Sequence, residues 1–519
     1  MGIKEIDFNI NSTSSTLKAI LTTPSNKNID IFAFLRGDGS YCVRFIPKEI
    51  GIYKVNIDEV TKSIEVKEIS KIPTLKLSDN KEYLELEKKP FFWLSDTWWM
   101  ALCGRLSFEE FKELAKIRKN QGFNVIQLVA GLFPDMDSFD KRGANRGGFA
   151  WEENYKTINS AFFDDAEEKI EYLYSIGLHI ALVGSWGYYL EKMGIKKIKE
   201  HWRYLIARWG VYTSVYIAAG EASMPYYLST NREAESESLK SGWSEIVKYI
   251  KEIDKLDRIL TIHPIESSLN EIEDVNLLDI NLLQASHSSY ESVKGGVKLL
   301  KATSAKKLSI MDEINYEGIL RDNYDGVIRL SFWKSILNNS KGFGYGANGI
   351  WQVNREEEPF GASPNGAVWG NIAWSEAIKF KGAKDLVKSK EFLEDFEWWK
   401  LQNCDNLIDC NNLDEPRSPA IATIENRLYI AYFYNPIAPW DKHYTIKLKA
   451  NNNYNYYFFC PNTYQKSNVE EFNTNSSGKW QMPTPPSLDD WVLIIEFKNQ
   501  STTKKRKSFY EKLKKFIFK

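Results

Sequence analysis

Short apolar strands alternate with amphipathic helices from about residue 90 to residue 352, and this alternation restricts the chain to folds built on a parallel sheet. One predicted helix begins at Ser107, with Glu110 three residues later in the pattern of a capping box. The predicted strands are 91–97, 123–130, 179–187, 211–221, 259–264, 277–287, the strand that ends at Glu313, and 342–352. Eight such units favour a (β/α)8 barrel, since no Gly-rich nucleotide loop follows the first strand.

Both flanks of this region carry short runs that alternate apolar and polar residues and are separated by Gly, Asn, Asp and Pro. The predicted fold class is therefore α/β, a (β/α)8 TIM barrel flanked by an N-terminal and a C-terminal β-sandwich domain. The predicted boundaries are 1–75 for the first sandwich, 76–400 for the barrel, 401–497 for the second sandwich and 498–519 for a basic tail.

Composition excludes several classes of function. A net charge of −1 over 519 residues argues against nucleic acid as a partner. The five cysteines form no CxxC pair, so neither a zinc site nor a disulfide framework is indicated, and we expect reduced thiols. The N-terminus lacks an apolar stretch of signal-peptide length, and no run approaches 18 apolar residues. We therefore expect a cytoplasmic protein.

The C-terminal tail is strongly basic, whereas the whole chain is nearly neutral. Residues 504–519 hold eight Lys or Arg against one Glu, and on a helix Phe509, Leu513, Phe516 and Ile517 form one apolar stripe. This pattern is typical of a helix that lies in the interface of an anionic membrane, which would place the protein on the cytoplasmic face. A solvated tail, or a helix packed on the protein itself, is the alternative.

Polar and aromatic residues recur where the predicted strands end. In a parallel barrel these ends converge on one face, which is where substrates bind. An aromatic content of 14% supports a carbohydrate ligand, because sugar rings pack on aromatic faces. The predicted substrate-binding residues are Asp96, Trp98, Gln127, Trp186, His263, His287, Tyr316, Tyr345 and Trp351. Any single one of them could instead be a core residue.

Two carboxylates stand out among the strand ends, Glu221 after the fourth strand and Glu313 after the seventh. Glycosidic cleavage needs one protonated carboxyl and one ionised carboxylate that face each other. Glu221 follows the uncharged run VYIAAG, which would raise its pKa by desolvation, so we assign it as acid/base. Glu313, near Asn315, Tyr316 and His287, would be the ionised nucleophile. A separation of roughly 5–5.5 Å would mean retention and roughly 6.5–9.5 Å inversion.

Seven motifs in this order, WLSDTWWMALCGRLSFEEF, QGFNVIQ, VYIAAGE, TIHP, LLQASH, MDEINYEG and GFGYGANGIWQ, resemble those of the apiosidase-like glycoside hydrolases. The barrel of that family was long catalogued as a domain of unknown function. The N-terminal module is similar to a shortened form of the sandwich that often precedes this barrel. The C-terminal β-domain is similar to one of collagen-binding type, a label that we do not take as a function here.

The resemblance implies a retaining glycosidase in which the carboxylate after strand four is the acid/base and the Glu of MDEINYEG is the nucleophile. These positions are Glu221 and Glu313. This chain differs from the usual family sequence in two motifs, and both differences bear on which substrate the site would accept. The family usually has Asp where this chain has Glu221, and it commonly reads GDTAW where this chain has Ser95 and Trp98 in SDTWW.

The leading hypothesis is a glycoside hydrolase acting on a branched or bacterial surface polysaccharide, or on its precursor. The alternative is a non-catalytic glycan-binding or scaffold protein of polysaccharide assembly on the same barrel. A metal-dependent hydrolase is disfavoured because the five His residues show neither HxH nor HExxH spacing. We expect no metal and no cofactor.

Overall fold

The computed structural model describes residues 2–320, 322–409, 415–434 and 444–498. The chain divides into two compact units, residues 1–328 with 340–387 and residues 329–339 with 388–519. The first unit contains the barrel and the N-terminal module, and the second contains the C-terminal β-domain.

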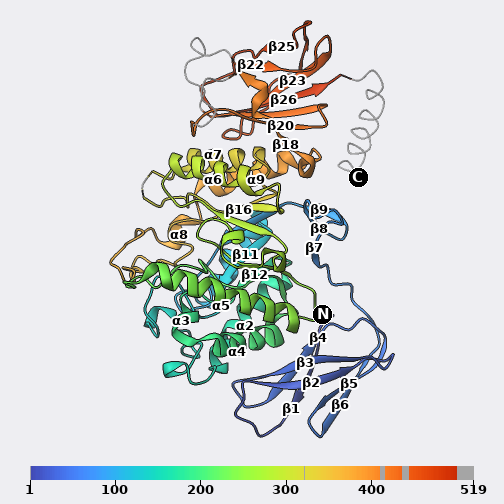
Figure 1. Ribbon diagram of the computed structural model, residues 1–519, viewed down its shortest axis with the longest axis vertical. Coiled ribbons are helices and arrows are strands. Elements are labelled where there is room, and N and C mark those ends of the chain that lie inside the picture. Colours follow the sequence, from blue (N-terminus) through green and yellow to red (C-terminus); the bar gives the residue numbers. More distant parts are fainter. Residues whose placement is uncertain (1, 321, 410–414, 435–443, 499–519) are drawn as a thin grey trace. The chain divides into compact units, whose positions relative to one another are not determined.

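The centre of the first unit is an eight-stranded parallel barrel (Figure 1). Its strands are β10 (Trp93–Thr97), β11 (Val125–Val129), β12 (His179–Val183), β13 (Thr213–Ile217), β14 (Ile259–Thr261), β15 (Asn281–Gln284), β16 (Ser309–Glu313) and β17 (Gly342–Tyr345). They are hydrogen-bonded in the order β14-β13-β12-β11-β10-β17-β16-β15. The predicted eight-stranded barrel is confirmed, and every predicted strand contains one of these strands.

Helices follow the strands as the βα pattern predicts. They are α1 (Phe108–Gln121), α2 (Ser160–Ser175), α3 (Tyr189–Met193), α4 (Ile195–Trp209), α5 (Arg232–Ile253), α6 (Tyr290–Thr303), α7 (Asp325–Leu337), α8 (Trp374–Ala377) and α9 (Lys381–Leu393). The capping box predicted for α1 is present, since Ser107 and Glu110 each bond the backbone N–H of the other. The last two thirds of α7 and the end of α9 belong to the second unit.

Side chains rather than a backbone ladder close the barrel between β14 and β15. The Ser268 hydroxyl donates to the Ile262 carbonyl at 2.6 Å, lies 3.2 Å from the Leu282 carbonyl and accepts the Leu282 N–H at 2.9 Å. Thr261 Oγ1 donates to the Ile280 carbonyl at 2.9 Å. Both hydroxyl groups are buried, so these bonds replace the hydrogen bonds that β14 and β15 would otherwise exchange.

The N-terminal module of the first unit is one six-stranded antiparallel sheet in the order β1-β4-β3-β2-β5-β6. Its strands are β1 (Lys4–Phe8), β2 (Thr16–Thr22), β3 (Asn28–Leu35), β4 (Tyr41–Phe45), β5 (Gly51–Ile57) and β6 (Val60–Val66), and a hairpin sheet of β7 (Leu75–Leu77), β8 (Leu84–Leu86) and β9 (Lys89–Phe91) leads into the barrel. Buried Arg44 joins the module to the barrel helices through Glu167 at 3.0 Å and the Arg208 carbonyl at 2.5 Å.

The second unit holds two antiparallel sheets. The strands are β18 (Gln402–Asn403), β19 (Ile408–Asp409), β20 (Ala420–Ile424), β21 (Leu428–Phe433), β22 (Thr445–Lys447), β23 (Asn453–Phe459), β24 (Glu470–Asn473), β25 (Lys479–Gln481) and β26 (Trp491–Phe497). Six form the sheet β18-β20-β21-β26-β23-β24, and three form β19-β22-β25. Both sheets contribute to one apolar core, with Ile446 from the smaller sheet and Leu493 from the larger. Within this unit, Arg329 pairs with Asp490 at 2.6 Å.

The predicted membrane-binding tail, 498–519, falls outside the described residues apart from Lys498, and membrane binding stays a prediction. Among the helices that the structure describes, none combines the length and apolar character needed to cross a bilayer.

The hydrogen bonds by which Ser268 closes the barrel between β14 and β15 yield a stability prediction. Replacing Ser268 with Ala removes the hydroxyl and leaves a buried N–H and a buried carbonyl without their partner, which should cost about 1–3 kcal/mol. Thermal and urea unfolding of the purified protein measure this loss. Ser175→Ala is the matched control, because the Ser175 hydroxyl donates only to the Tyr172 carbonyl at the exposed end of α2. Equal stability of the two variants would contradict a closing role for Ser268.

Candidate functional site

The candidate site is built around Glu313 at the end of β16. Its carboxylate lies 3.2 Å from His263 Nε2 and 3.2 Å from His287 Nε2, and it accepts the Tyr316 hydroxyl at 2.7 Å. The side chain is only 8% exposed. Burial alone would raise the pKa of Glu313, but the contacts with His263 and His287 outweigh it and hold the pKa well below its usual range. Glu313 is therefore a carboxylate at neutral pH.

An irregularity in β16 directs two successive acidic side chains into the barrel. The pairing with β15 shifts by one residue at Asp312, so Leu283 pairs with Met311 and Gln284 with Glu313. Side chains of a regular strand alternate between faces, and the extra residue breaks that alternation. Asp312 consequently faces the interior as Glu313 does, where it accepts Gln127 Nε2 at 3.0 Å.

His263 lies between these two acids. Its Nδ1 is 3.4 Å from Asp312 Oδ2, and its Nε2 is 3.2 Å from Glu313 Oε2. Burial lowers the pKa of the imidazole, but contact with Asp312 and Glu313 overcomes that effect and raises the pKa to about 10. The side chain is therefore a buried cation, and its charge offsets the desolvation of Glu313.

The tautomer of His287 follows from its own partners. Its Nδ1 accepts the backbone N–H of Tyr316 at 3.2 Å, so the ring proton of the neutral imidazole lies on Nε2. That nitrogen faces Glu313 Oε1, and His287 can donate to the carboxylate without being charged.

Glu221 follows β13, and its carboxyl group has different surroundings. It accepts Trp186 Nε1 at 3.1 Å and Gln284 Nε2 at 3.0 Å, and the side chain is partly exposed. Desolvation raises the pKa of Glu221, the charge of Glu313 raises it further, and the result is about 7. Gln284 is also the register partner of Glu313, so the residue that binds one carboxyl stands beside the other.

The backbone around Glu221 is fitted to its neighbour. Glu221 itself has a backbone φ of +43°, which residues other than Gly rarely adopt. A Cβ atom at Gly220 would lie 2.4 Å from the Trp186 ring, so only glycine lets the indole reach the carboxyl. Glycine at position 220 is thus required by the packing of Trp186.

Aromatic rings form the remaining wall near the carboxyls. The ring of Trp99 lies 5.6 Å from that of Trp186 and 5.3 Å from that of His263, both edge-on. The ring of Trp351 lies 6.3 Å from that of Tyr316. The Trp351 Nε1–H finds no hydrogen-bond partner among the described residues, although Trp351 is only 5% exposed. This arrangement offers flat apolar faces and a free donor close to the two carboxyls.

The structure brings most of the predicted site residues together. Glu313 contacts His263, His287 and Tyr316, and the ring of Tyr316 lies near that of Trp351. Glu221 contacts Trp186, whose ring lies 6.1 Å from that of His263, and Gln127 reaches His263 through Asp312. Gln127 and His263 have no exposed surface, so they position the acidic groups and do not form the surface of the site. The sequence motifs LLQASH and WLSDTWW contain Gln284 and Trp99, but sequence reasoning did not predict either as a site residue.

Three predicted substrate contacts are corrected by the structure. Asp96 is fully buried, pairs with Arg118 of α1 at 2.7 Å and accepts Trp98 Nε1 at 2.8 Å, while Tyr345 lies beside the same guanidinium and donates to Glu317. Successive side chains of β10 point to opposite sides of the barrel wall, and this explains where Asp96 lies. Ser95 faces the barrel interior, where it accepts Gln127 Nε2, so Asp96 points to the opposite side, toward α1.

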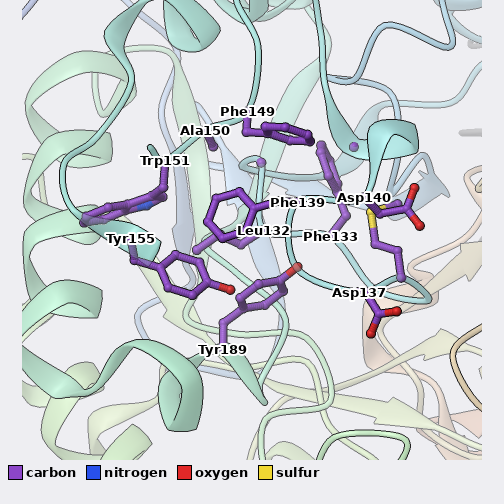
Figure 2. A pocket seen from close by; sticks show the side chains of 13 residues that line it. Leu132, Phe133, Asp137, Phe139, Asp140, Phe149, Ala150, Trp151, Tyr155 and Tyr189 are labelled. Atoms are coloured by element: carbon purple, nitrogen blue, oxygen red, sulfur yellow. The ribbon is translucent and has the colours of Figure 1, made fainter. Parts of the chain in front are cut away.

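A separate hollow lies within the loop after β11 and has about 310 Å³ of atom-free space partly open to solvent. Figure 2 shows the Phe139 ring lying among those of Phe149, Tyr155 and Tyr189. The Phe139 ring lies 5.0 Å from that of Tyr155 and 5.6 Å from that of Phe149. None of the lining residues belongs to the site around Glu313, and the rings of the loop pack together with Tyr189 of α3.

The acidic and histidine residues of the site do not form a metal-binding cluster. Over the described part of the chain, no group of three or more His, Cys, Asp or Glu residues is arranged to hold a metal ion. The four described cysteines are free thiols.

Comparison with known proteins identifies relatives of the barrel. A sequence model of the family described as "Apiosidase-like, catalytic domain" matches residues 78–400. A family 5 glycoside hydrolase from Bacteroides vulgatus ATCC 8482 is 21% identical over 82% of this chain and 93% of its own, with a TM-score of 0.65. Another solved structure, named only as a glycoside hydrolase, is 22% identical over 82% of this chain and 97% of its own, with a TM-score of 0.66. These likenesses show the fold. The search of curated proteins found no match.

The opposite pKa shifts of the two carboxyls predict opposite effects on stability. A raised pKa favours folding while the group is protonated, and that contribution is lost as the pH rises from the ordinary value of about 4.3 through 7. Glu221→Gln should therefore gain stability relative to the wild type on going from pH 5 to pH 8, by about 1–3 kcal/mol after allowance for partial exposure.

Glu313→Gln is the matched comparison, with the opposite sign. A lowered pKa stabilises the fold above the unfolded-state value, and this contribution is lost as the pH falls. We expect Glu313→Gln to destabilise the protein at pH 8 and to do so less at pH 3, below the unfolded-state value of about 4.3. Thermal unfolding of both variants across this range measures the two slopes, and slopes of the same sign would contradict the assignment.

Proposed function

The chain belongs to the apiosidase-like family of glycoside hydrolases, and from that premise we propose that it is a retaining glycosidase with Glu221 as acid/base and Glu313 as nucleophile. The observation that carries the proposal is the pair of carboxyls with opposite surroundings. Glu313 is surrounded by His263, His287 and the Tyr316 hydroxyl, and Glu221 is bound by two uncharged donors. Such a pair supplies the ionised and the protonated group that the reaction needs.

In the proposed first step, a Glu313 carboxylate oxygen bonds to the anomeric carbon as the glycosidic C–O bond breaks. Glu221 gives its proton to the leaving oxygen. In the second step, Glu221 takes a proton from water, the water oxygen bonds to the anomeric carbon, and the C–O bond to Glu313 breaks. Both carboxyls return to their starting states, and the net reaction adds one water molecule across the bond.

The hydrogen bonds to Glu313 have to change during this reaction. The Tyr316 hydroxyl and the two histidines bind the carboxylate in the free enzyme. When Glu313 becomes an ester these donors lose most of the charge they stabilise, which makes the ester a better leaving group for the second step. Asp312 still faces His263 in the ester and continues to raise the pKa of its imidazole.

The substrate that we propose is a branched or bacterial surface polysaccharide or its precursor. The rings of Trp99 and Trp186 beside the carboxyls suit the flat C–H faces of a sugar. The Trp351 Nε1–H and the Gln284 Oε1, neither of which is paired with any residue that the structure describes, supply one donor and one acceptor for hydroxyl groups.

The kinetic test separates the two carboxyl roles. Glu313→Gln should lower turnover of every glycan and aryl glycoside at least about 10³-fold, because no bond to the anomeric carbon can form. Glu221→Gln should lose turnover of glycans but still release the aryl group of an activated aryl glycoside in a first burst, because that leaving group needs no proton. Hydrolysis of the Glu313 ester should then be slow, because the variant has no base to take the proton from water.

Glu291→Gln, the same change at an exposed position in the first turn of α6, is the control and should behave as the wild type. Proton NMR of the first product released by the wild type should show the anomeric configuration of the substrate. Undiminished activity of Glu313→Gln would end the proposal, and an inverted product would end the retaining mechanism alone.

A further inference from the structure

Glu271 is a buried acidic residue whose carboxyl group accepts backbone N–H groups from two neighbouring loops. It follows the 3-10 turn Ser268–Asn270 in the loop after β14, and the residue is 2% exposed. Its Oε2 accepts the N–H of Ser223 in the loop after β13 at 2.7 Å, and its Oε1 accepts the N–H of Ile265 at 3.0 Å. One carboxyl group therefore joins the backbones that follow β13 and β14.

The backbone bonding between β13 and β14 weakens just before these two N–H groups. Beyond the paired strands, the Ala218 N–H donates to the Thr261 carbonyl at 2.8 Å, and the His263 N–H donates to the Ala219 carbonyl at 2.9 Å. The next bond, from the Ala222 N–H to the His263 carbonyl, lengthens to 3.4 Å. Buried N–H groups need an acceptor, and from this point the carboxyl of the Glu271 side chain supplies it to both chains.

Both N–H groups lie close in sequence to residues of the candidate site. Ser223 is two residues after Glu221, and Ile265 is two residues after His263. Burial raises the pKa of Glu271, and the bonds from Ser223 and Ile265 and the charge of His263 oppose that shift. Glu271 is thus within electrostatic reach of His263 and fixes the backbone on which Glu221 stands.

The backbone of Glu221 needs such support. A φ of +43° is rare for a residue with a side chain and persists only where the surrounding structure holds it. The loop also packs directly on Gly187, since a Cβ atom there would lie 2.5 Å from the carbonyl oxygens of Glu221 and Ala222. The Gly187 N–H donates to the Gly220 carbonyl at 2.7 Å. Gly187 and Glu271 together hold Glu221 in its unusual conformation.

We propose that Glu271 is a positioning residue for the acid/base, because it fixes the backbone of Glu221 so that the carboxyl proton meets the leaving oxygen. This inference rests on the proposed function. Both Glu271 oxygens are occupied by backbone N–H groups, so Glu271 acts through Glu221 and takes no part in making or breaking bonds. Its loss should therefore slow the reactions that need the proton of Glu221 more than those that do not.

The kinetic test compares two aryl glycosides of a sugar that the wild type hydrolyses. Glu271→Gln replaces one oxygen with an NH2 group, which would face a backbone N–H, so two donors meet and the loop has to move. Turnover of the phenyl glycoside should fall about 10²-fold, because its leaving group needs a well-placed proton. The first burst from the 2,4-dinitrophenyl glycoside should stay within about threefold of the wild type, because that leaving group needs none.

Glu273→Gln is the matched control, since it makes the same change at an exposed position two residues later in the same loop. It should behave as the wild type on both substrates. Glu271→Asp, whose carboxyl is one methylene shorter, replaces Glu271→Gln if that variant does not fold, and it should show the same dependence on the leaving group.

NMR of the indole groups tests the position of Glu221 without turnover. The Trp186 Nε1–H donates to Glu221 Oε2 at 3.1 Å, so its proton–nitrogen signal reports on that carboxyl. We expect this signal, assigned with Trp186→Phe, to move in Glu271→Gln. The signal of Trp98, which bonds Asp96, should stay where it is.

Three results would each overturn the inference and leave the proposed function standing. They are an equal loss of activity on the two aryl glycosides, an undiminished turnover of the phenyl glycoside, and an unmoved Trp186 signal in Glu271→Gln. No hydrolysis of any glycan or aryl glycoside by the wild type would contradict the proposed function and, with it, the role assigned to Glu271.

Discussion

The buried contact between His263 and the two acids of β16 determines the chemistry of this site. An imidazole with no exposed surface would ordinarily be neutral, because desolvation disfavours its charge. Here Asp312 and Glu313 lie 3.4 Å and 3.2 Å from its two nitrogens, and the cation becomes the favoured form. The cation keeps Glu313 ionised, and the ionised Glu313 in turn raises the pKa of Glu221. Removing any one charge would change the protonation of the others.

The fold supplies what this contact needs. The barrel brings Glu221 and Glu313 close enough for the charge of Glu313 to raise the pKa of Glu221, and the shift in pairing at Asp312 turns both acids of β16 inward. Gln127 fixes the far oxygen of Asp312, and Gln284 holds Glu221 while standing beside Glu313. Beyond the strand ends, Asp135 joins the loop after β11 to Tyr227 in the loop after β13 and to Ser363 in the loop after β17.

The sequence predicted the parts of this arrangement that depend on local pattern. Apolar strands between amphipathic helices indicated the barrel, and the apolar run before Glu221 indicated a raised pKa, as the structure has it. The ring of strand-end residues was predicted only in part, because a sequence does not say which face of a strand its last side chains occupy. Asp96 and Tyr345 thus pack toward α1, while the neighbouring Ser95 faces the interior.

Other features depend on contacts between distant residues. The extra residue in β16 is visible only once the register with β15 is known, and the closure of the barrel by Ser268 has no counterpart in hydrophobic periodicity. Gln284 and Trp99 lay in motifs that pointed to the site, yet their roles follow from Glu221 and His263 across the barrel. Such pairings are set by the closed ring of strands and not by sequence spacing.

Carbon-13 NMR titration of protein labelled at the glutamate carboxyls tests the central claim most directly, with Glu221→Gln and Glu313→Gln used to assign the signals. The account predicts that Glu221 titrates near pH 7, that Glu313 stays ionised well below pH 4, and that the pKa of Glu221 falls in Glu313→Gln because a nearby negative charge is gone. Two independent titrations in the ordinary range near 4.3, with Glu221 unaffected by the Glu313 substitution, would contradict it.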